Sequence, residues 1–161
     1  MEIERLNSDA WRRLKELRVR SLADAPDAFA TTLADVKQLP EEAWRQQLET
    51  LATFVAVDER VDLGIARGVT DHSIADQAFL VSMWVAPEAR GKRAGERLIQ
   101  AVAGWARDTG HTRLVLDVAD ANISAIALYE RMGFIRTGET GALPPPREHI
   151  LEHRRALDLG H

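Results

Sequence analysis

Hydrophobic and polar positions change their period several times along the chain, and each change marks a predicted element. Short alternating or continuous apolar runs predict strands over residues 1–6, 53–57, 62–69, 78–85, 112–118, 134–139 and 148–157. Apolar residues at helical spacing predict helices that begin near Asn7 or Ser8, at Pro40, at Ala94 and at Asn122. This order, β-α-α-β-β-β-α-β-α-β-β, is typical of an α/β (α+β) domain with a mixed, largely antiparallel sheet flanked by helices.

Composition narrows the class of protein without naming a function. The 161 residues are 45% hydrophobic and 29% charged, which fits one ordinary globular domain over residues 1–161. A net charge of -4 gives no general attraction to nucleic acid or anionic lipid, and the absence of cysteine excludes disulfides and thiolate chemistry. The N-terminus is charged and no apolar run approaches the roughly 20 residues that span a bilayer. We therefore expect a cytoplasmic protein that binds neither membrane nor nucleic acid.

One junction between a strand and a helix has the composition of an anion site. In "VAPEARGKRAGERLIQ", residues 85–100, a basic turn with Gly91 and Gly95 leads directly into a helical pattern. Such a turn aims free backbone N–H groups at one point, and glycine lets a ligand approach the backbone. A diphosphate is the expected anion, and the alternative is an ordinary solvated helix N-terminus. Neither a P-loop nor a dinucleotide-binding glycine pattern is present.

The same stretch resembles the acyl-CoA-binding segment of the GNAT superfamily of N-acetyltransferases, whose pattern is Gln/Arg-x-x-Gly-x-Gly/Ala. Arg90 stands at its first position and Gly95 at its last. Arg93 replaces the middle glycine, and we expect helical backbone angles at Arg93 that still present its N–H group.

A second block strengthens this resemblance. "VADANISAIALYERMGF", residues 118–134, is similar to the family's Asn-x-x-Ala-x-x-Leu-Tyr-x-x-x-Gly-Phe pattern. The resemblance implies a GNAT-like fold with splayed central strands, and acetyl-CoA as co-substrate. The residues that it places at the acyl-CoA are Met83, Val85, Arg90, Gly91, Lys92, Arg93, Ala94, Gly95, Asn122 and Tyr129. Asn122 can also be a plain helix cap.

Acetyl transfer to an amine needs a proton donor for the leaving thiolate and a neutral amine. Tyr129 is the only tyrosine, and the resemblance implies that it is the general acid, since a phenol stays protonated at neutral pH. The alternative is a core tyrosine with its hydroxyl at the rim. For the base we select Asp117, because the apolar residues around it predict burial and a raised pKa. A half-exposed aspartate is the alternative.

Other residues could serve the acceptor side of the site. Glu148, His149 and His153 compete with Asp117 as base, and a water-relayed base is equally compatible. Three residues of the first interhelical loop, Asp24, Asp27 and Phe29, could shape the acceptor pocket. No cysteine or carboxylate cluster completes a ligand set around the histidines, so we expect no metal site.

The leading hypothesis is an N-acetyltransferase that moves acetyl from acetyl-CoA to a primary amine of a small molecule, directly, in a ternary complex. An alternative acceptor is a peptide substrate, at a protein N-terminus or lysine. A hypothesis of another class is a non-catalytic acyl-CoA-binding regulatory domain. The resemblance is also compatible with a homodimer.

Overall fold

The computed structural model describes residues 1–160, within which seven strands form one sheet in the order β1-β2-β3-β4-β5-β7-β6. The strands are β1 (Glu2–Arg5), β2 (Ala52–Asp58), β3 (Val61–Thr70), β4 (Gln77–Val85), β5 (Arg113–Ala119), β6 (Ile135–Ala142) and β7 (Leu151–Asp158). Only the β4–β5 pair is parallel, so the predicted mixed, largely antiparallel sheet is confirmed.

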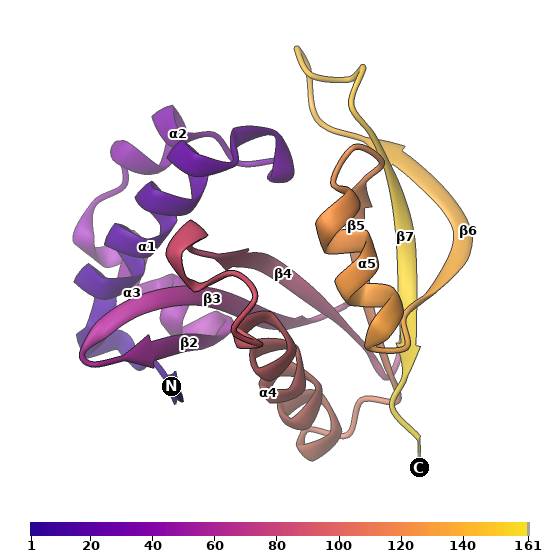
Figure 1. Ribbon diagram of the computed structural model, residues 1–161, viewed down its shortest axis with the longest axis horizontal. Helices are drawn as coiled ribbons and strands as arrows, with labels where there is room; N and C mark the ends of the chain where they lie inside the picture. Colours follow the sequence, from indigo (N-terminus) through magenta and orange to yellow (C-terminus); the bar gives the residue numbers. More distant parts are fainter. Residues whose placement is uncertain (161) are drawn as a thin grey trace.

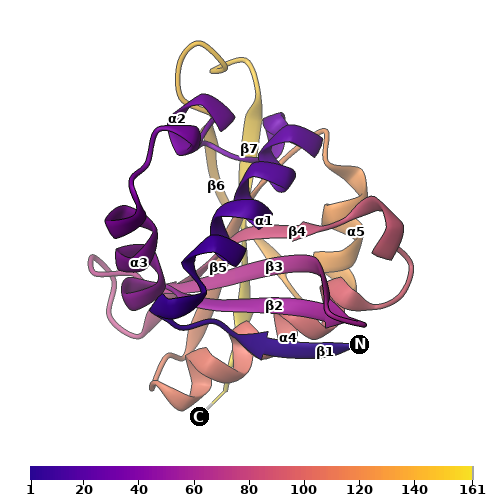
Figure 2. The same ribbon diagram turned by 90° about the vertical axis from the view of Figure 1, so that its left-hand side faces the viewer.

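Helices cover both faces of the sheet (Figures 1 and 2). They are α1 (Trp11–Asp24), α2 (Leu33–Lys37), α3 (Glu41–Thr50), α4 (Ala94–Asp108) and α5 (Ile123–Arg131). α1 and α3 pack on one face, in a core with Trp44, Ile65 and Trp84. α4 and α5 pack on the opposite face, in a core with Leu98 and Tyr129. The sheet thus separates two hydrophobic cores.

The position of β4 at the middle of the sheet follows from its composition. Leu80 belongs to the core beneath α4, and Trp84 belongs to the core beneath α1. A strand with apolar residues on both faces must be covered on both sides. The prediction that residues 78–85 form a central strand is confirmed.

Some predicted boundaries were wrong. Helix α2 was not predicted, although Thr32 and Asp35 form a complete capping box at its start. Pro40 is the N-cap of α3 rather than its first helical residue. β7 begins at Leu151 and not at Glu148, because the preceding residues form turns in which the Ile150 N–H donates to the Arg147 carbonyl oxygen.

The central strands diverge, as predicted. Residues 77–79 of β4 pair with residues 113–115 of β5, and the pairing ends there. Further along, β4 pairs only with β3, across a bulge at which Ser82 has a φ of 58°. The splay leaves the last part of β4 without a neighbour on its β5 side. Within residues 1–160, no helix is long and apolar enough to cross a membrane.

Candidate functional site

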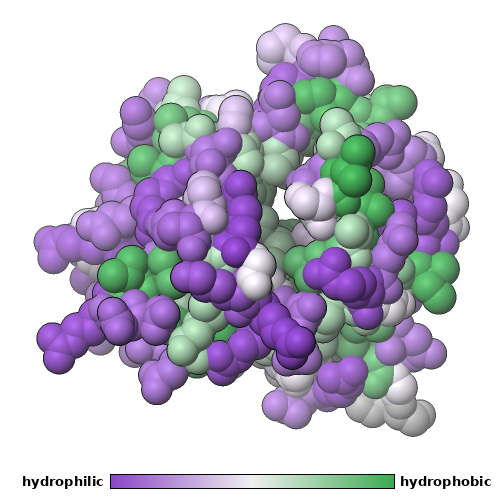
Figure 3. Space-filling model, viewed as in Figure 1, coloured by the Kyte–Doolittle hydropathy of each residue, from purple (hydrophilic) through white to green (hydrophobic). Residues whose placement is uncertain are grey.

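The splay opens a cavity of about 930 Å³ between the two halves of the sheet. Figure 3 shows the molecule hollowed at this place. One wall comes from α1, the loop that follows it, β3 and β4, and the other comes from β5, α5 and β7. The turn before α4 forms one end. Of the ten residues predicted to bind acyl-CoA, all except the exposed Lys92 line this cavity.

The turn before α4 has an unusual backbone. Gly91 has a φ of 81°, and Arg93, the N-cap of α4, has a φ of 66° and a ψ of 15°. The expectation of helical angles at Arg93 is therefore wrong. The left-handed conformation is one that glycine adopts freely and other residues adopt at a cost of about 1 kcal/mol. This explains in physical terms why the family pattern has glycine at that position.

Backbone N–H groups in this turn are available to a ligand. The Arg90 N–H donates to the Pro87 carbonyl oxygen at 3.3 Å, and the Arg97 N–H donates to the Arg93 carbonyl oxygen at 3.2 Å. Among residues 1–160, no acceptor is found for the N–H groups of residues 91–96. The positive end of the α4 dipole lies at the same point. This geometry suits a diphosphate.

Two basic side chains of the turn are directed differently from one another. The Arg90 guanidinium turns back and donates to the Asp24 carboxylate at 2.7 Å and to the Val85 carbonyl oxygen at 3.2 Å. Arg93 lines the cavity, as does Arg131 of α5, which the sequence analysis missed. The charge of Arg90 is thus already balanced, whereas Arg93 has no ion pair within residues 1–160.

Gly91 and Gly95 serve different purposes. A Cβ atom on Gly91 would meet nothing within 4 Å. A Cβ atom on Gly95 would lie 2.8 Å from Leu128 Cδ2 and 3.2 Å from Met83 Cε. On the side of its missing Cβ, Gly95 therefore makes room for close packing of α4 against α5 and β4, and the approach of a ligand to its backbone stays a prediction.

Tyr129 lies on α5, where it belongs to the hydrophobic core beneath α4 and also lines the cavity. It is 6% exposed and packs edge-to-face on Phe134, with the ring centroids 5.8 Å apart. Within residues 1–160, its hydroxyl has no hydrogen-bond partner. Burial raises the pKa of Tyr129 well above its ordinary value, so the hydroxyl remains a proton donor at neutral pH.

Asn122 caps α5. Its Oδ1 accepts a hydrogen bond from the Ala125 N–H at 3.4 Å, which confirms the capping interpretation. The residue also lines the cavity. Its amide nitrogen remains available as a donor.

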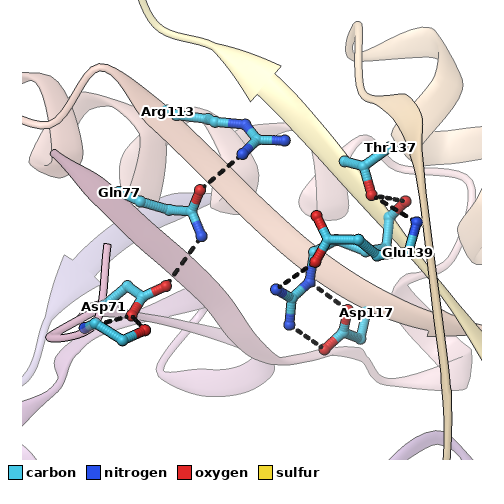
Figure 4. A network of polar contacts seen from close by, with 8 residues as sticks. Asp71, Gln77, Arg113, Asp117, Thr137 and Glu139 are labelled. Carbon is cyan, nitrogen blue, oxygen red and sulfur yellow. Dashed lines mark hydrogen bonds and ion pairs between the residues drawn. The ribbon is translucent and has the colours of Figure 1, made fainter. Parts of the chain in front are cut away.

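The predicted burial of Asp117 is wrong. Its side chain is 41% exposed, and Arg154 binds it through Nε at 2.9 Å and through Nη2 at 3.1 Å (Figure 4). The same guanidinium also donates to Glu139 at 3.2 Å. Successive residues of a strand alternate faces, so Leu116 and Val118 enter the core while Asp117 points away from it. Asp117 does line the cavity.

A carboxylate that sequence reasoning missed lies close to it. Glu152 of β7 lines the cavity, is partly buried and has no ion pair within residues 1–160. Burial, and secondarily repulsion from Asp117, raise the pKa of Glu152. The register that pairs Ala119 with Glu152 and Asp117 with Arg154 places these side chains on one face. Only knowledge of that register could have selected Glu152.

The remaining candidates divide between the cavity and its surroundings. Asp24 and Phe29 line the cavity, whereas Glu148, His149 and His153 do not. His153 Nδ1 instead contacts Asp120 Oδ1. Asp27 also lies outside the cavity lining and pairs with Arg147 at 3.7 Å.

The loop between β6 and β7 reaches across to the loop after α1. The Arg147 guanidinium donates to the carbonyl oxygens of Pro26 at 2.7 Å and of Ala30 at 2.8 Å. The two halves of the molecule are therefore connected beside the cavity. Within residues 1–160, no group of three or more His, Asp or Glu residues could hold a metal ion.

Comparison with known proteins identifies a family and several relatives. The profile described as the Acetyltransferase (GNAT) family matches residues 11–134. A mycothiol acetyltransferase from Salinispora arenicola (strain CNS-205) is 31% identical over 134 residues, which are 81% of this chain and 42% of that protein. A streptothricin acetyltransferase from Streptomyces lavendulae is 37% identical over 91 residues, 56% of this chain and 48% of that protein. The chain thus spans less than half of these curated relatives.

Solved structures share the fold over nearly the whole chain. An acetyltransferase of the GNAT family from Streptococcus pneumoniae matches with a TM-score of 0.83 and 19% identity, covering 99% of each chain. A putative acetyltransferase from Salmonella typhimurium, solved with its cofactor acetyl-CoA, matches with a TM-score of 0.80 and 18% identity, covering 100% of this chain and 95% of that one.

Proposed function

Because the chain belongs to the acetyltransferase (GNAT) family, we propose that it moves an acetyl group from acetyl-CoA to a primary amine of a small molecule, directly, in a ternary complex. The observation that carries this proposal is the set of N–H groups at residues 91–96, which have no acceptor within residues 1–160 and belong to a turn that lines the same cavity as Tyr129.

The donor side of the cavity fits acetyl-CoA. The N–H groups of residues 91–96 would bind the diphosphate, with Arg93 adding positive charge. Arg131 lies on the same cavity but already pairs with Glu96 at 3.8 Å. The pantetheine arm would lie along β4 near Met83 and Val85, where the sheet has no strand on that side. The Asn122 amide would donate to the same arm. The thioester would then lie between the splayed strands.

Tyr129 would complete the transfer as general acid. The amine nitrogen forms a bond to the thioester carbonyl carbon, and the carbon–sulfur bond breaks. The Tyr129 hydroxyl gives its proton to the departing thiolate, and the proton lost by the amine goes to a base. A buried phenol without an internal hydrogen-bond partner has its proton free for this donation.

We propose Glu152 ahead of Asp117 as that base. Arg154 holds the Asp117 carboxylate by two hydrogen bonds, whereas Glu152 has no such partner within residues 1–160. A carboxylate with a raised pKa is also the better proton acceptor. Asp117 stays a candidate that mutagenesis can separate from Glu152.

Two observations support a small-molecule acceptor. Arg147 connects the β6–β7 loop to the loop after α1, and this connection restricts the approach of a folded protein to the cavity. Two relatives are named for the small molecules mycothiol and streptothricin. A homodimer and a cytoplasmic location stay predictions.

Release of the free thiol of coenzyme A tests the proposed function. The purified chain is incubated with acetyl-CoA and a panel of amines, and the expected result is amine-dependent thiol release with formation of the N-acetyl product. A thermal shift with acetyl-CoA but no turnover of any amine would instead support a regulatory domain.

A further inference from the structure

The cavity wall contains two buried arginines that have no anionic partner within residues 1–160. Arg18 of α1 is 3% exposed and Arg67 of β3 is 7% exposed. Arg67 alternates with Ala66 and so lies on the same face of the sheet as Ile65, in the core with α1. Both cations therefore belong to the side of the sheet opposite α4 and the diphosphate site.

The hydrogen bonds of these arginines are incomplete. Arg67 donates through Nε to Ser82 Oγ at 2.8 Å and through Nη1 to Gln47 Oε1 at 2.7 Å, both neutral acceptors. Arg18 donates no side-chain hydrogen bond within residues 1–160, and its buried Nη1 has no partner. The Arg18 guanidinium lies over the Phe29 ring, 5.1 Å from its centroid. No carboxylate of residues 1–160 forms an ion pair with either arginine.

This arrangement is unfavourable in the protein alone. Burial lowers the pKa of Arg18 to about 10, and burial together with repulsion from Arg18 lowers the pKa of Arg67 to about 9. Both groups remain cations at neutral pH. A buried charge without a counter-ion is strongly unfavourable. The partly buried Arg154, in contrast, has carboxylate partners in Asp117 and Glu139. An anion bound from outside the chain would therefore stabilise these two buried cations.

We propose that Arg18 and Arg67 bind a carboxylate of the acceptor, so that the amine substrate is an amino acid or a related amino carboxylate. The assignment of the carboxylate to an acceptor rests on the proposed acetyl transfer. Arg67 donates two of its five N–H groups, to Ser82 and Gln47, and Arg18 donates none, so the pair retains donors for both oxygens of a carboxylate.

The rest of the cavity has the complementary charge. Asp117 and Glu152 line the opposite wall, on β5 and β7. A zwitterion would place its carboxylate at the two arginines and its ammonium group toward these carboxylates, where the proposed base lies. Binding at Arg18 and Arg67 would thus orient the amine toward the thioester.

Binding of a non-reactive anion tests the subsite independently of turnover. Hexanoate and hexanamide, which have the same length and differ in charge, are titrated into the protein while the arginine Nε–H resonances are followed by NMR. Hexanoate is expected to saturate and shift the Arg18 and Arg67 signals, and hexanamide is not. The Arg18→Met variant should bind hexanoate about 10-fold or more weakly. Arg12→Met, an exposed arginine of the same helix, should bind as the wild type does.

Turnover gives the second measurement. Amino acids are compared with their amides, with kcat/KM expressed per neutral amine. We expect the carboxylates to be preferred about 10-fold or more, and the preference to fall below about 3-fold in Arg18→Met. The same variant should melt no lower than the wild type, because it removes an unpaired buried charge. If Arg18 had only a structural role, its replacement would lower the melting temperature and would not selectively remove the preference for amino acids over their amides.

The outcomes separate the two proposals. Hexanoate binding without turnover of any amine would support the subsite and remove the proposed acetyl transfer. Turnover of amines without preference for the carboxylate would overturn the subsite and leave acetyl transfer standing. Equal hexanoate binding by the wild type and Arg18→Met would also overturn it. Tighter binding of inorganic phosphate than of hexanoate at Arg18 would overturn the carboxylate assignment.

Discussion

The Asp24 carboxylate receives the Arg90 guanidinium at 2.7 Å and the Trp84 indole N–H at 3.0 Å on the same oxygen, Oδ2. One side chain at the end of α1 thereby holds both the last part of β4 and the turn before α4. The contact fixes the end of α1 relative to the turn before α4.

Removal of this carboxylate charge should therefore weaken both connections. We expect Asp24→Asn to lower the free energy of unfolding by about 1 kcal/mol, since a charge-assisted hydrogen bond to each donor is lost or weakened. Urea denaturation followed by tryptophan fluorescence measures it. The exposed Asp108→Asn is the control, expected within about 0.5 kcal/mol of the wild type. Equal stability of Asp24→Asn and the control would contradict the structural role of Asp24.

The left-handed Arg93 predicts an unusual response to glycine. We expect Arg93→Gly to be as stable as the wild type or more stable, because relief of about 1 kcal/mol of backbone strain offsets the entropy that glycine gains in the unfolded chain. Arg93→Val should be clearly less stable, since a β-branched residue is least tolerant of positive φ. The neighbouring Lys92→Gly has no positive φ to relieve and should lose about 0.5 kcal/mol. Thermal unfolding of the three variants checks the order, and a less stable Arg93→Gly would refute the strain.

Tyr129→Phe separates the proposed role of the hydroxyl as proton donor from the role of the ring in packing. Phenylalanine keeps the ring on Phe134, so folding and acetyl-CoA affinity should change little, while kcat should fall about 100-fold. Thiol release and calorimetric titration with acetyl-CoA measure the two quantities. Unchanged kcat would remove Tyr129 as general acid, and equal losses of binding and turnover would indicate a packing role instead.

Glu152 and Asp117 can be separated by the dependence of kcat/KM on pH. The raised pKa of Glu152 means that the base form is lost as pH falls through a value above that of an ordinary glutamate. Glu152→Gln should therefore abolish this acidic limb and lower kcat/KM about 100-fold. Asp117→Asn should retain most activity and move the limb to lower pH, because it removes the repulsion that helps to raise the Glu152 pKa. The opposite pattern would identify Asp117 as the base.

The pH dependence of folding stability tests whether the pKa of Glu152 is raised in the folded protein. A carboxyl group whose pKa is raised in the folded state binds its proton more tightly there than in the unfolded chain. The folded state therefore loses stability as pH rises from the ordinary glutamate pKa through the raised one. Glu152→Gln removes this loss and should melt no lower than the wild type at pH 7, and a clear drop in melting temperature would contradict it.

The sequence was most informative where local chemistry decides the structure. The glycine-containing turn before α4, the cap at Asn122 and the continuous apolar run of β4 depend on neighbours in the chain, and the structure has these elements where they were predicted, although the backbone angles expected at Arg93 were wrong. Other boundaries were missed, and helix α2 was missed in spite of its local capping box. The start of β7 depends on a turn that includes Arg147, whose side chain contacts Pro26 and Ala30 more than a hundred residues earlier.

The errors in the candidate site have the same origin. Asp117 has apolar neighbours in sequence, but strand alternation turns it to an open face where Arg154 binds it. Arg18 and Arg67 read as ordinary polar positions of a helix and a strand, and only the folded arrangement buries them together. A contiguous motif therefore allowed the sequence to select most of the residues on the α4 side of the cavity. On the opposite side it selected Asp24, Phe29 and Asp117 but not Arg18, Arg67 or Glu152, which separate elements bring together.

Only three residue pairs connect β4 to β5 within residues 1–160. The segment before residue 113 and the segment from residue 113 onward therefore share few backbone hydrogen bonds. Residues 113–160 could detach as a cooperative unit without loss of the hydrophobic core around α1, so their amide hydrogens should exchange with solvent faster than those of β2 and β3. A coenzyme seated between the segments would slow exchange on both sides at once. Binding of the coenzyme would then determine how long the two segments stay together, in addition to supplying the acetyl group.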